Sequence, residues 1–238
     1  MSTEEPLLIT GVAKRVGLHL AHTFLDRGIP VIGTYRSQRP TLVDLERKGA
    51  ELHQCDFNDE AQINALVQAI VQKHHSLRAI IHNASDWLSE KADLQSSEIM
   101  RRMMQVHVSA PYLLNLALEP LLLASHAMHA DIIHVGDYVS SRGSKKHIAY
   151  AASKAAQDNL TQSFASKLAP KVKVNSLAPA LVLLNEDDDD DYRRKALDKS
   201  LMQREGGLDE FKHAIDYLLQ SHYVTGRVLP MDGGRHLR

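Results

Sequence analysis

Tyr150 and Lys154 are the two residues whose types and spacing most clearly suggest chemistry. Side chains four positions apart share one face of a helix, so the phenol and the ammonium group would lie together. A free tyrosine has a pKa of about 10 and is a poor acid or base at neutral pH, but a nearby positive charge favours its phenolate. Asp137 lies thirteen residues upstream of Tyr150, at the end of an expected strand. Its carboxylate would oppose Lys154 by raising the pKa of the phenol, so the two acids would titrate as a coupled pair.

A turn suited to phosphate binding follows the first expected strand, in the sequence TGVAKRVG over residues 10–17. Gly11 and Gly17 allow a ligand to approach the backbone closely. The next helix would point its N-terminus, with free N–H groups and partial positive charge, at a pyrophosphate. Arg15 stands where the dinucleotide fingerprint has its middle glycine, and Lys14 precedes it. Both would add positive charge where phosphates would sit.

Polar side chains follow the next three expected strands. Arg36 and Ser37 end the second strand, where an acid would bind a ribose 2′-hydroxyl and an arginine accommodates a 2′-phosphate. The sequence therefore favours NADP(H) as cofactor. Asp56 follows the third strand and could accept a hydrogen bond from the adenine amino group. The segment 83–85, Asn-Ala-Ser, follows the fourth strand.

Short apolar runs alternate with helical patterns along the chain. The expected strands are 7–9, 31–32, 51–53, 79–81, 132–135 and 172–174. Between two of them, apolar residues at i, i+3, i+4, i+7 and i+8 predict a helix over 59–73, with Asp59 as its cap and Gln62 three residues on. Repeated alternation of this kind predicts an α/β fold with a parallel sheet and helices on both faces. Since no linker or repeat interrupts the pattern, we expect one domain over residues 1–238.

Composition excludes several classes of protein. The net charge is −1 with histidine neutral, and no basic patch favours nucleic acid. Cys55 is the only cysteine, so an intramolecular disulfide is impossible and a cytoplasmic location is expected. No apolar run approaches the roughly 20 residues that span a bilayer, so no membrane partner is expected. The histidines lack metal-ligand context, and the acidic run 186–191 is expected to be an exposed, mobile loop without a metal.

In their order, these residues resemble the short-chain dehydrogenase/reductase family. Its motifs are matched at 10–17, 56, 83–84, 150–154, 174–179 and 225–234. The resemblance implies a single Rossmann-type, doubly wound, seven-stranded parallel sheet, NADPH as cofactor, no metal and a homotetramer. The residues then expected to bind the cofactor are Gly11, Lys14, Arg15, Val16, Gly17, Arg36, Ser37, Asp56, Phe57, Asn83, Ala84, Ser85, Tyr150, Lys154 and Pro179.

A finer resemblance is to the pteridine reductases, and within them to the bacterial dihydromonapterin reductases. Arg15 replaces the same glycine, and Asp137 stands where the family at large has a serine. Trp87, shortly after Asn83-Ala84-Ser85, would stack on a flat pterin. The resemblance implies Tyr150, Lys154 and Asp137 as catalytic residues. The residues then expected to bind substrate are Ser85, Trp87, Asp137 and Tyr150.

The expected reaction is NADPH-dependent reduction of a dihydropterin, 7,8-dihydromonapterin, with weak dihydrofolate reduction left open. Hydride goes to C6 of a ring imine and a proton must reach N5; Asp137 either carries that proton or only holds the pterin. His107 stands where most of the family has an asparagine that supports a proton relay, and it is either a substitute or a structural residue. Two alternatives are a general carbonyl reductase of 3-oxoacyl substrates and a non-catalytic NADPH sensor.

Overall fold

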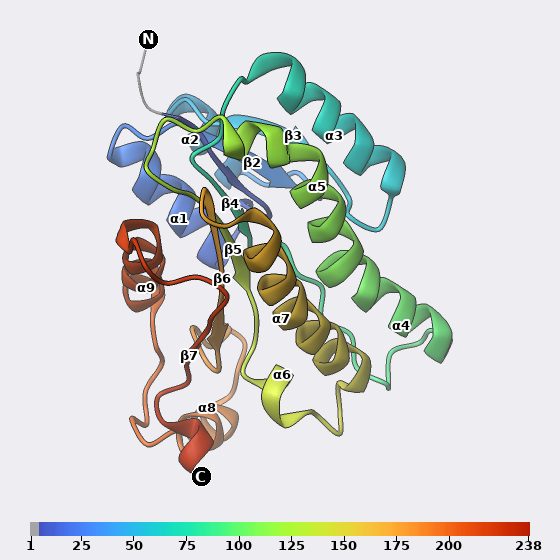
Figure 1. Ribbon diagram of the computed structural model, residues 1–238. Helices are drawn as coiled ribbons and strands as arrows, with labels where there is room; N and C mark the ends of the chain where they lie inside the picture. Colours follow the sequence, from blue (N-terminus) through green and yellow to red (C-terminus); the bar gives the residue numbers. More distant parts are fainter. Residues whose placement is uncertain (1–4) are drawn as a thin grey trace.

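The computed structural model describes residues 5–238, and its centre is one parallel sheet (Figure 1). The strands are β1 (Leu7–Ile9), β2 (Val31–Tyr35), β3 (Glu51–Gln54), β4 (Ala79–His82), β5 (Ala130–Val135), β6 (Val172–Pro179) and β7 (Val228–Met231). Within residues 5–238 they are seven in number, in the order β3-β2-β1-β4-β5-β6-β7, with every neighbouring pair parallel. The predicted seven-stranded, doubly wound sheet is confirmed. The single domain over 1–238 stays a prediction, and its first four residues lie outside the described part.

Helices cover both faces of the sheet. They are α1 (Arg15–Asp26), α2 (Thr41–Arg47), α3 (Glu60–Lys73), α4 (Ser96–Met104), α5 (Ala110–Leu123), α6 (Val139–Arg142), α7 (Ile148–Leu168), α8 (Asp190–Leu197) and α9 (Leu208–Gln220). A π-helical turn, η1 (Gln105–Ser109), joins α4 to α5, and a 3₁₀ turn, η2 (Arg235–Leu237), lies near the C-terminus. In Figure 1, α1 and α9 lie to the left of the sheet and α3, α5 and α7 to its right.

Alternation along the strands explains the two layers of helices. Leu8 and Ile80 pack in a core with α3, α5 and α7, whereas Leu7, Ile9 and Ile81 pack in a second core with α1 and α9. Successive side chains of a strand point to opposite faces, so buried strands that are apolar throughout need helices on both sides. This pattern made the layered fold predictable from the sequence.

Local details agree with the predictions in some places and differ in others. Asp59 caps α3, accepting hydrogen bonds from the N–H groups of Ala61 and Gln62. The strand predicted at 172–174 continues to residue 179, and β7 was not visible as an apolar run. The expectation of a loop at 186–191 was wrong at its end, because α8 begins at Asp190 and Asp189 caps it. Carboxylates stabilise a helix N-terminus, so the run of acids starts a helix here.

The segment Ser96–Leu123 forms one continuous helix through α4, η1 and α5. Contrary to the expectation of no such segment, it is long and apolar enough, by length and composition alone, to cross a membrane. Half of its most apolar window is buried inside the protein. Leu114, Leu118 and Leu122 pack in the core beneath α3 and α7, so the apolar composition serves the packing of the sheet.

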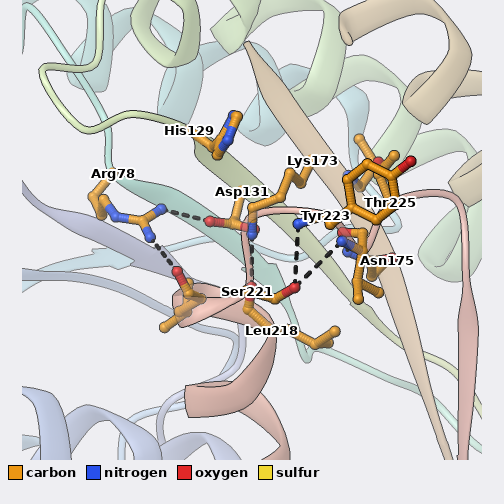
Figure 2. A network of polar contacts seen from close by, with 12 residues as sticks. Arg78, His129, Asp131, Lys173, Asn175, Leu218, Ser221, Tyr223 and Thr225 are labelled. Carbon is orange, nitrogen blue, oxygen red and sulfur yellow. Dashed lines mark hydrogen bonds and ion pairs between the residues drawn. The ribbon is translucent and has the colours of Figure 1, made fainter. Parts of the chain in front are cut away.

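A buried ion cluster fixes α9 at the amino end of the sheet (Figure 2). Asp131 on β5 accepts hydrogen bonds from Lys173 on β6 and from Arg78 just before β4, both at 2.6 Å. The same two cations donate to the Leu218 and Leu219 carbonyls of the last turn of α9, at 2.6 and 2.7 Å. Positive charge is favourable at a helix C-terminus, so the cluster joins three strands to one helix end.

The motif residues Asn175 and Thr225 lie near this ion cluster and connect β6 with the segment before β7 (Figure 2). The Asn175 side chain donates to the Val224 carbonyl at 2.9 Å and accepts from the Arg227 N–H at 3.1 Å. The Thr225 hydroxyl accepts from the Val174 N–H at 3.0 Å. These bonds place β7 beside β6 at the edge of the sheet.

Candidate active site

The phosphate-binding turn has the close backbone approaches that its glycines suggest. Gly11 has a φ of +75°, and a Cβ on Gly17 would lie 2.1 Å from the Gly11 oxygen, so no larger residue fits there. Asn83 holds the turn from β4, its amide donating to the oxygens of Thr10 and Gly11 at 2.9 and 3.0 Å. The structure thus brings together the motif at 10–17 and the motif at 83–85.

Arg15, which we expected to add positive charge where phosphates would sit, also makes contacts within the protein. Its φ is +53°, the left-handed conformation that its replaced glycine would adopt easily. Its guanidinium donates to Asn185 Oδ1 at 2.6 Å and to the Leu183 oxygen at 2.9 Å. The side chain therefore joins the phosphate turn to the segment after β6, which closes one side of the site.

A cavity of about 540 Å³ opens along the carboxyl ends of β1 to β4. Most of the predicted cofactor-binding residues line it: Gly11, Lys14, Arg15, Val16, Gly17, Arg36, Ser37, Asp56, Phe57, Asn83, Ala84 and Ser85. Trp87, Asp86 and Asn185 also line the cavity, whereas Tyr150, Lys154, Asp137 and Pro179 do not. Sites in open parallel sheets form beyond the carboxyl ends of the strands, so this position is the expected one.

Two charged side chains of the cavity have partners that the sequence did not reveal. Arg36 donates to the Asp86 carboxylate at 3.2 Å while its side chain remains 55% exposed, so the side chain is still accessible to a ligand. Asp56 accepts from the backbone and the side chain of Asn58, at 3.0 and 3.2 Å. Asp86 was missed because fifty positions separate it from Arg36 and only the fold brings them together.

Asp137 and Tyr150 are in direct contact. The Tyr150 hydroxyl donates to Asp137 Oδ2 at 2.8 Å, and Oδ1 accepts from the Val139 N–H at 2.9 Å. Burial raises the pKa of the Asp137 carboxyl, although hydrogen bonds and the charge of Lys154 act against this. Burial, followed by the charge of Asp137, raises the pKa of Tyr150 well above its ordinary value. Asp137 was expected to raise the pKa of Tyr150 and Lys154 to lower it. The pKa of Tyr150 is raised, so the phenol stays neutral.

Lys154 lies one helical turn after Tyr150 on α7 and is almost completely buried. Its ammonium donates to the Val135 oxygen at 2.7 Å and to Gln157 Oε1 at 3.3 Å. It lies 5.8 Å from the centre of the Tyr150 ring. Burial lowers the pKa of Lys154 to about 8, while Asp137 and Asp158 act to raise it. An ammonium has three donors, so one remains beyond these two bonds.

His107 lies within η1 and is fully buried. Its Nδ1 is 2.8 Å from Ser153 Oγ on α7, and its Nε2 is 2.8 Å from Ser85 Oγ after β4. Burial lowers the pKa of His107 well below its ordinary value, and the charge of Lys154 acts in the same direction. A π-turn inside a longer helix is rare and is often found at a functional site.

Trp87 is 65% exposed at the mouth of the cavity. It stacks on His147, with 4.2 Å between ring centres and 20° between planes. Nothing in the sequence marked His147, three residues before Tyr150, as its partner. Pro179 ends β6, and its oxygen accepts from the Tyr138 N–H at 3.0 Å, beside Asp137.

The family profile described as enoyl-(acyl carrier protein) reductase matches residues 11–236 of this chain. The chain belongs to the short-chain dehydrogenase/reductase family. Within this family the chain is similar to a dihydromonapterin reductase of Klebsiella pneumoniae, 54% identical over 98% of this chain and 97% of the relative. It is also similar to a dihydromonapterin reductase of Escherichia coli, 53% identical over the same shares. The predicted family is therefore confirmed.

Solved structures of the family have the same fold. The chain is similar to the FolM alternative dihydrofolate reductase 1 of Brucella suis in complex with NADP, with 25% identity and a TM-score of 0.85 over 100% of this chain and 97% of that one. It is also similar to the Pseudomonas aeruginosa RhlG/NADP active-site complex, with 25% identity and a TM-score of 0.87 over 99% and 98% of the two chains.

Proposed function

We propose that this protein reduces a dihydropterin with NADPH, and that its substrate is 7,8-dihydromonapterin. The observation that carries the proposal is the 2.8 Å contact of the Tyr150 hydroxyl with the Asp137 carboxylate. Both a ketone and a ring imine take up one hydride and one proton, but a ketone site needs only a neutral hydroxyl beside its tyrosine. A carboxyl can in addition accept hydrogen bonds from the amino and ring N–H groups of a pterin. Relatives more than half identical over nearly the whole chain carry the name dihydromonapterin reductase.

The cavity fits NADPH. Its glycine turn presents the N-terminus of α1 to a pyrophosphate, and Arg36 at the end of β2 is placed for a 2′-phosphate. Asp56 is placed for the adenine, and the remaining donor of Lys154 for a ribose hydroxyl. NADPH supplies the hydride when bound. Two solved relatives are complexes with NADP, which supports the assignment.

Asp137 and Tyr150 handle the proton in this proposal. The raised pKa values keep a proton on Tyr150 and bring the Asp137 carboxyl closer to neutrality than an ordinary aspartate. Tyr150 gives its proton to N5 of the pterin. Asp137, once it has taken up a proton from water, returns that proton to the Tyr150 oxygen. Lys154 orients the cofactor and lowers the cost of the transient phenolate through its charge. Trp87 and Ser85 bind the flat pterin at the mouth of the cavity.

Oxidation of NADPH with four substrates side by side tests the function. The purified protein is supplied with 7,8-dihydromonapterin, 7,8-dihydrobiopterin, dihydrofolate and a 3-oxoacyl thioester. We expect the highest kcat/KM with dihydromonapterin, a lower value with dihydrofolate, and no turnover of the thioester. Tyr150→Phe should abolish turnover while NADPH still binds. Preference for the thioester would establish a carbonyl reductase, and NADPH binding without any turnover would establish a sensor.

The cytoplasmic location and the homotetramer remain predictions from the sequence and its family resemblance. Burial raises the pKa of the Cys55 thiol to about 12, so this cysteine is held as an unreactive thiol inside the fold. Exposed apolar side chains on the helix 96–123, among them Met100, Tyr112 and Leu116, are compatible with contact between copies of the chain.

A further inference from the structure

The segment that carries Trp87 is attached to the start of α7 by two contacts of one residue, His147. The Trp87 ring stacks on the His147 ring, with 4.2 Å between centres and 20° between planes. His147 Nδ1 lies 3.0 Å from the Leu88 oxygen. Because a carbonyl oxygen can only accept, Nδ1 carries the proton and donates it to this bond. A stacked ring and a hydrogen bond thus fix two successive residues of the segment after β4.

Glu90 ties the same segment to α7 a second time. Its Oε1 accepts from the first two N–H groups of the helix, at 2.5 and 3.0 Å. The N-cap residue of α7, His147, makes no capping bond with its own side chain, so these N–H groups need another acceptor. A carboxylate is also favourable at the positive end of a helix. The position of Trp87 is therefore coupled to the helix that carries Tyr150.

The stack decides how a flat ligand can meet Trp87. An indole ring has two faces, and His147 covers one of them, so a ligand can stack only on the other. Trp87 lines the cavity and is 65% exposed, whereas His147 is not among the lining residues. An exposed side chain that a ligand must immobilise costs roughly 0.5–1.5 kcal/mol of binding free energy. A ring already fixed by His147 avoids much of this cost.

We propose that His147 is a positioning residue for the substrate, which holds Trp87 so that a pterin stacks on the face that His147 leaves free. The inference rests on the proposed function, because it concerns the pterin that this function assigns to the cavity mouth. Tyr150 lies three residues after His147, so the ring that holds Trp87 and the hydroxyl that gives the proton belong to one helix. Once a pterin is bound, Trp87 is fixed either way, so the effect belongs to KM and not to kcat.

Substitution can separate the stacked ring of His147 from its hydrogen bond. His147→Phe keeps an aromatic ring against Trp87 but removes the donor to the Leu88 oxygen. His147→Asn keeps a donor near the position of Nδ1 but removes the ring. His75→Ala, at an exposed histidine in the loop after α3, is the control for removal of a histidine elsewhere.

The test is KM for 7,8-dihydromonapterin and kcat at saturating NADPH. We expect His147→Asn to raise KM by about three- to tenfold, the effect of losing one aromatic pair, with kcat unchanged within about twofold. His147→Phe should restore KM to within about twofold of the wild type. Trp87→Ala should raise KM by roughly ten- to a hundredfold, as for loss of a ring that stacks on a base. In that background His147→Asn should have no further effect, because His147 acts through Trp87.

Trp87 is the only tryptophan of the chain, so its fluorescence anisotropy measures how firmly the ring is held before any ligand binds. His147→Asn should lower the anisotropy, whereas His147→Phe and His75→Ala should leave it unchanged. An unchanged dissociation constant for NADPH shows that each variant has folded.

Three results would overturn the inference. The first is an unchanged KM in His147→Asn or in Trp87→Ala. The second is an equal rise of KM in His147→Phe and His147→Asn, since the hydrogen bond and not the stack would then matter. The third is a rise of KM by the same factor with and without Trp87. A wild-type protein inactive on every dihydropterin would instead refute the proposed function, while the anisotropy would still show whether His147 holds Trp87.

Discussion

At the scale of single residues, burial decides the protonation of the reacting groups. Burial raises the pKa of Asp137 and of Tyr150 and lowers the pKa of Lys154 to about 8. The sequence showed that these three residues belong together and that Asp137 and Lys154 oppose each other. It could not show which effect prevails, because that depends on how completely the fold removes each group from water.

Arg36 is the residue on which the choice between NADPH and NADH depends. Arg36→Asp should weaken NADPH binding relative to NADH by roughly ten- to a hundredfold, because a carboxylate would replace the cation opposite the 2′-phosphate. Dissociation constants for both cofactors, measured by fluorescence, give the ratio. Arg47→Asp on the exposed side of α2 makes the same change in charge away from the cavity and serves as control. An unchanged ratio, or an equal shift in the control, contradicts the assignment.

At the scale of elements, the candidate active site lies where the carboxyl ends of β1 to β5 meet the first turns of α7. The motifs after β1, β2 and β4 could be placed from the sequence, since a strand and the turn after it are local patterns. The partners of these motifs could not. Arg15 meets Asn185 across 170 positions, and His107 meets Ser85 across 22 positions. The π-turn η1 was equally hidden, because it depends on a shift of backbone hydrogen bonds inside a helix of ordinary composition.

At the scale of the whole molecule, the two ends of the sheet have different tasks. The carboxyl ends of the strands hold the cavity, and the amino ends hold the ion cluster of Asp131, Lys173 and Arg78 (Figure 2). The layered fold followed from the apolar strands, but this cluster did not, because a charged residue in a strand gives no sign of its partners. The end of α9 is thus fixed at the edge of the sheet opposite the cavity.

The ion cluster should contribute strongly to stability. Asp131→Asn should lower the free energy of unfolding by about 3–5 kcal/mol, because it leaves the buried Lys173 ammonium without its counter-charge. Urea unfolding at one fixed protein concentration measures the change. Asp44→Asn, which removes an exposed ion pair on α2, should change it by at most about 1 kcal/mol. Equal effects of the two substitutions would show that the cluster is not important for stability.

The measurement that tests the central claim most directly compares the wild type with Asp137→Ser. Initial rates of NADPH oxidation are recorded for both proteins with 7,8-dihydromonapterin and with a 3-oxoacyl thioester. If the Asp137 carboxyl holds the pterin and returns a proton to Tyr150, the variant should lose about a hundredfold or more of its rate with the pterin, and its preference should shift toward the ketone. An undiminished pterin rate in Asp137→Ser would contradict the proton-handling role of Asp137.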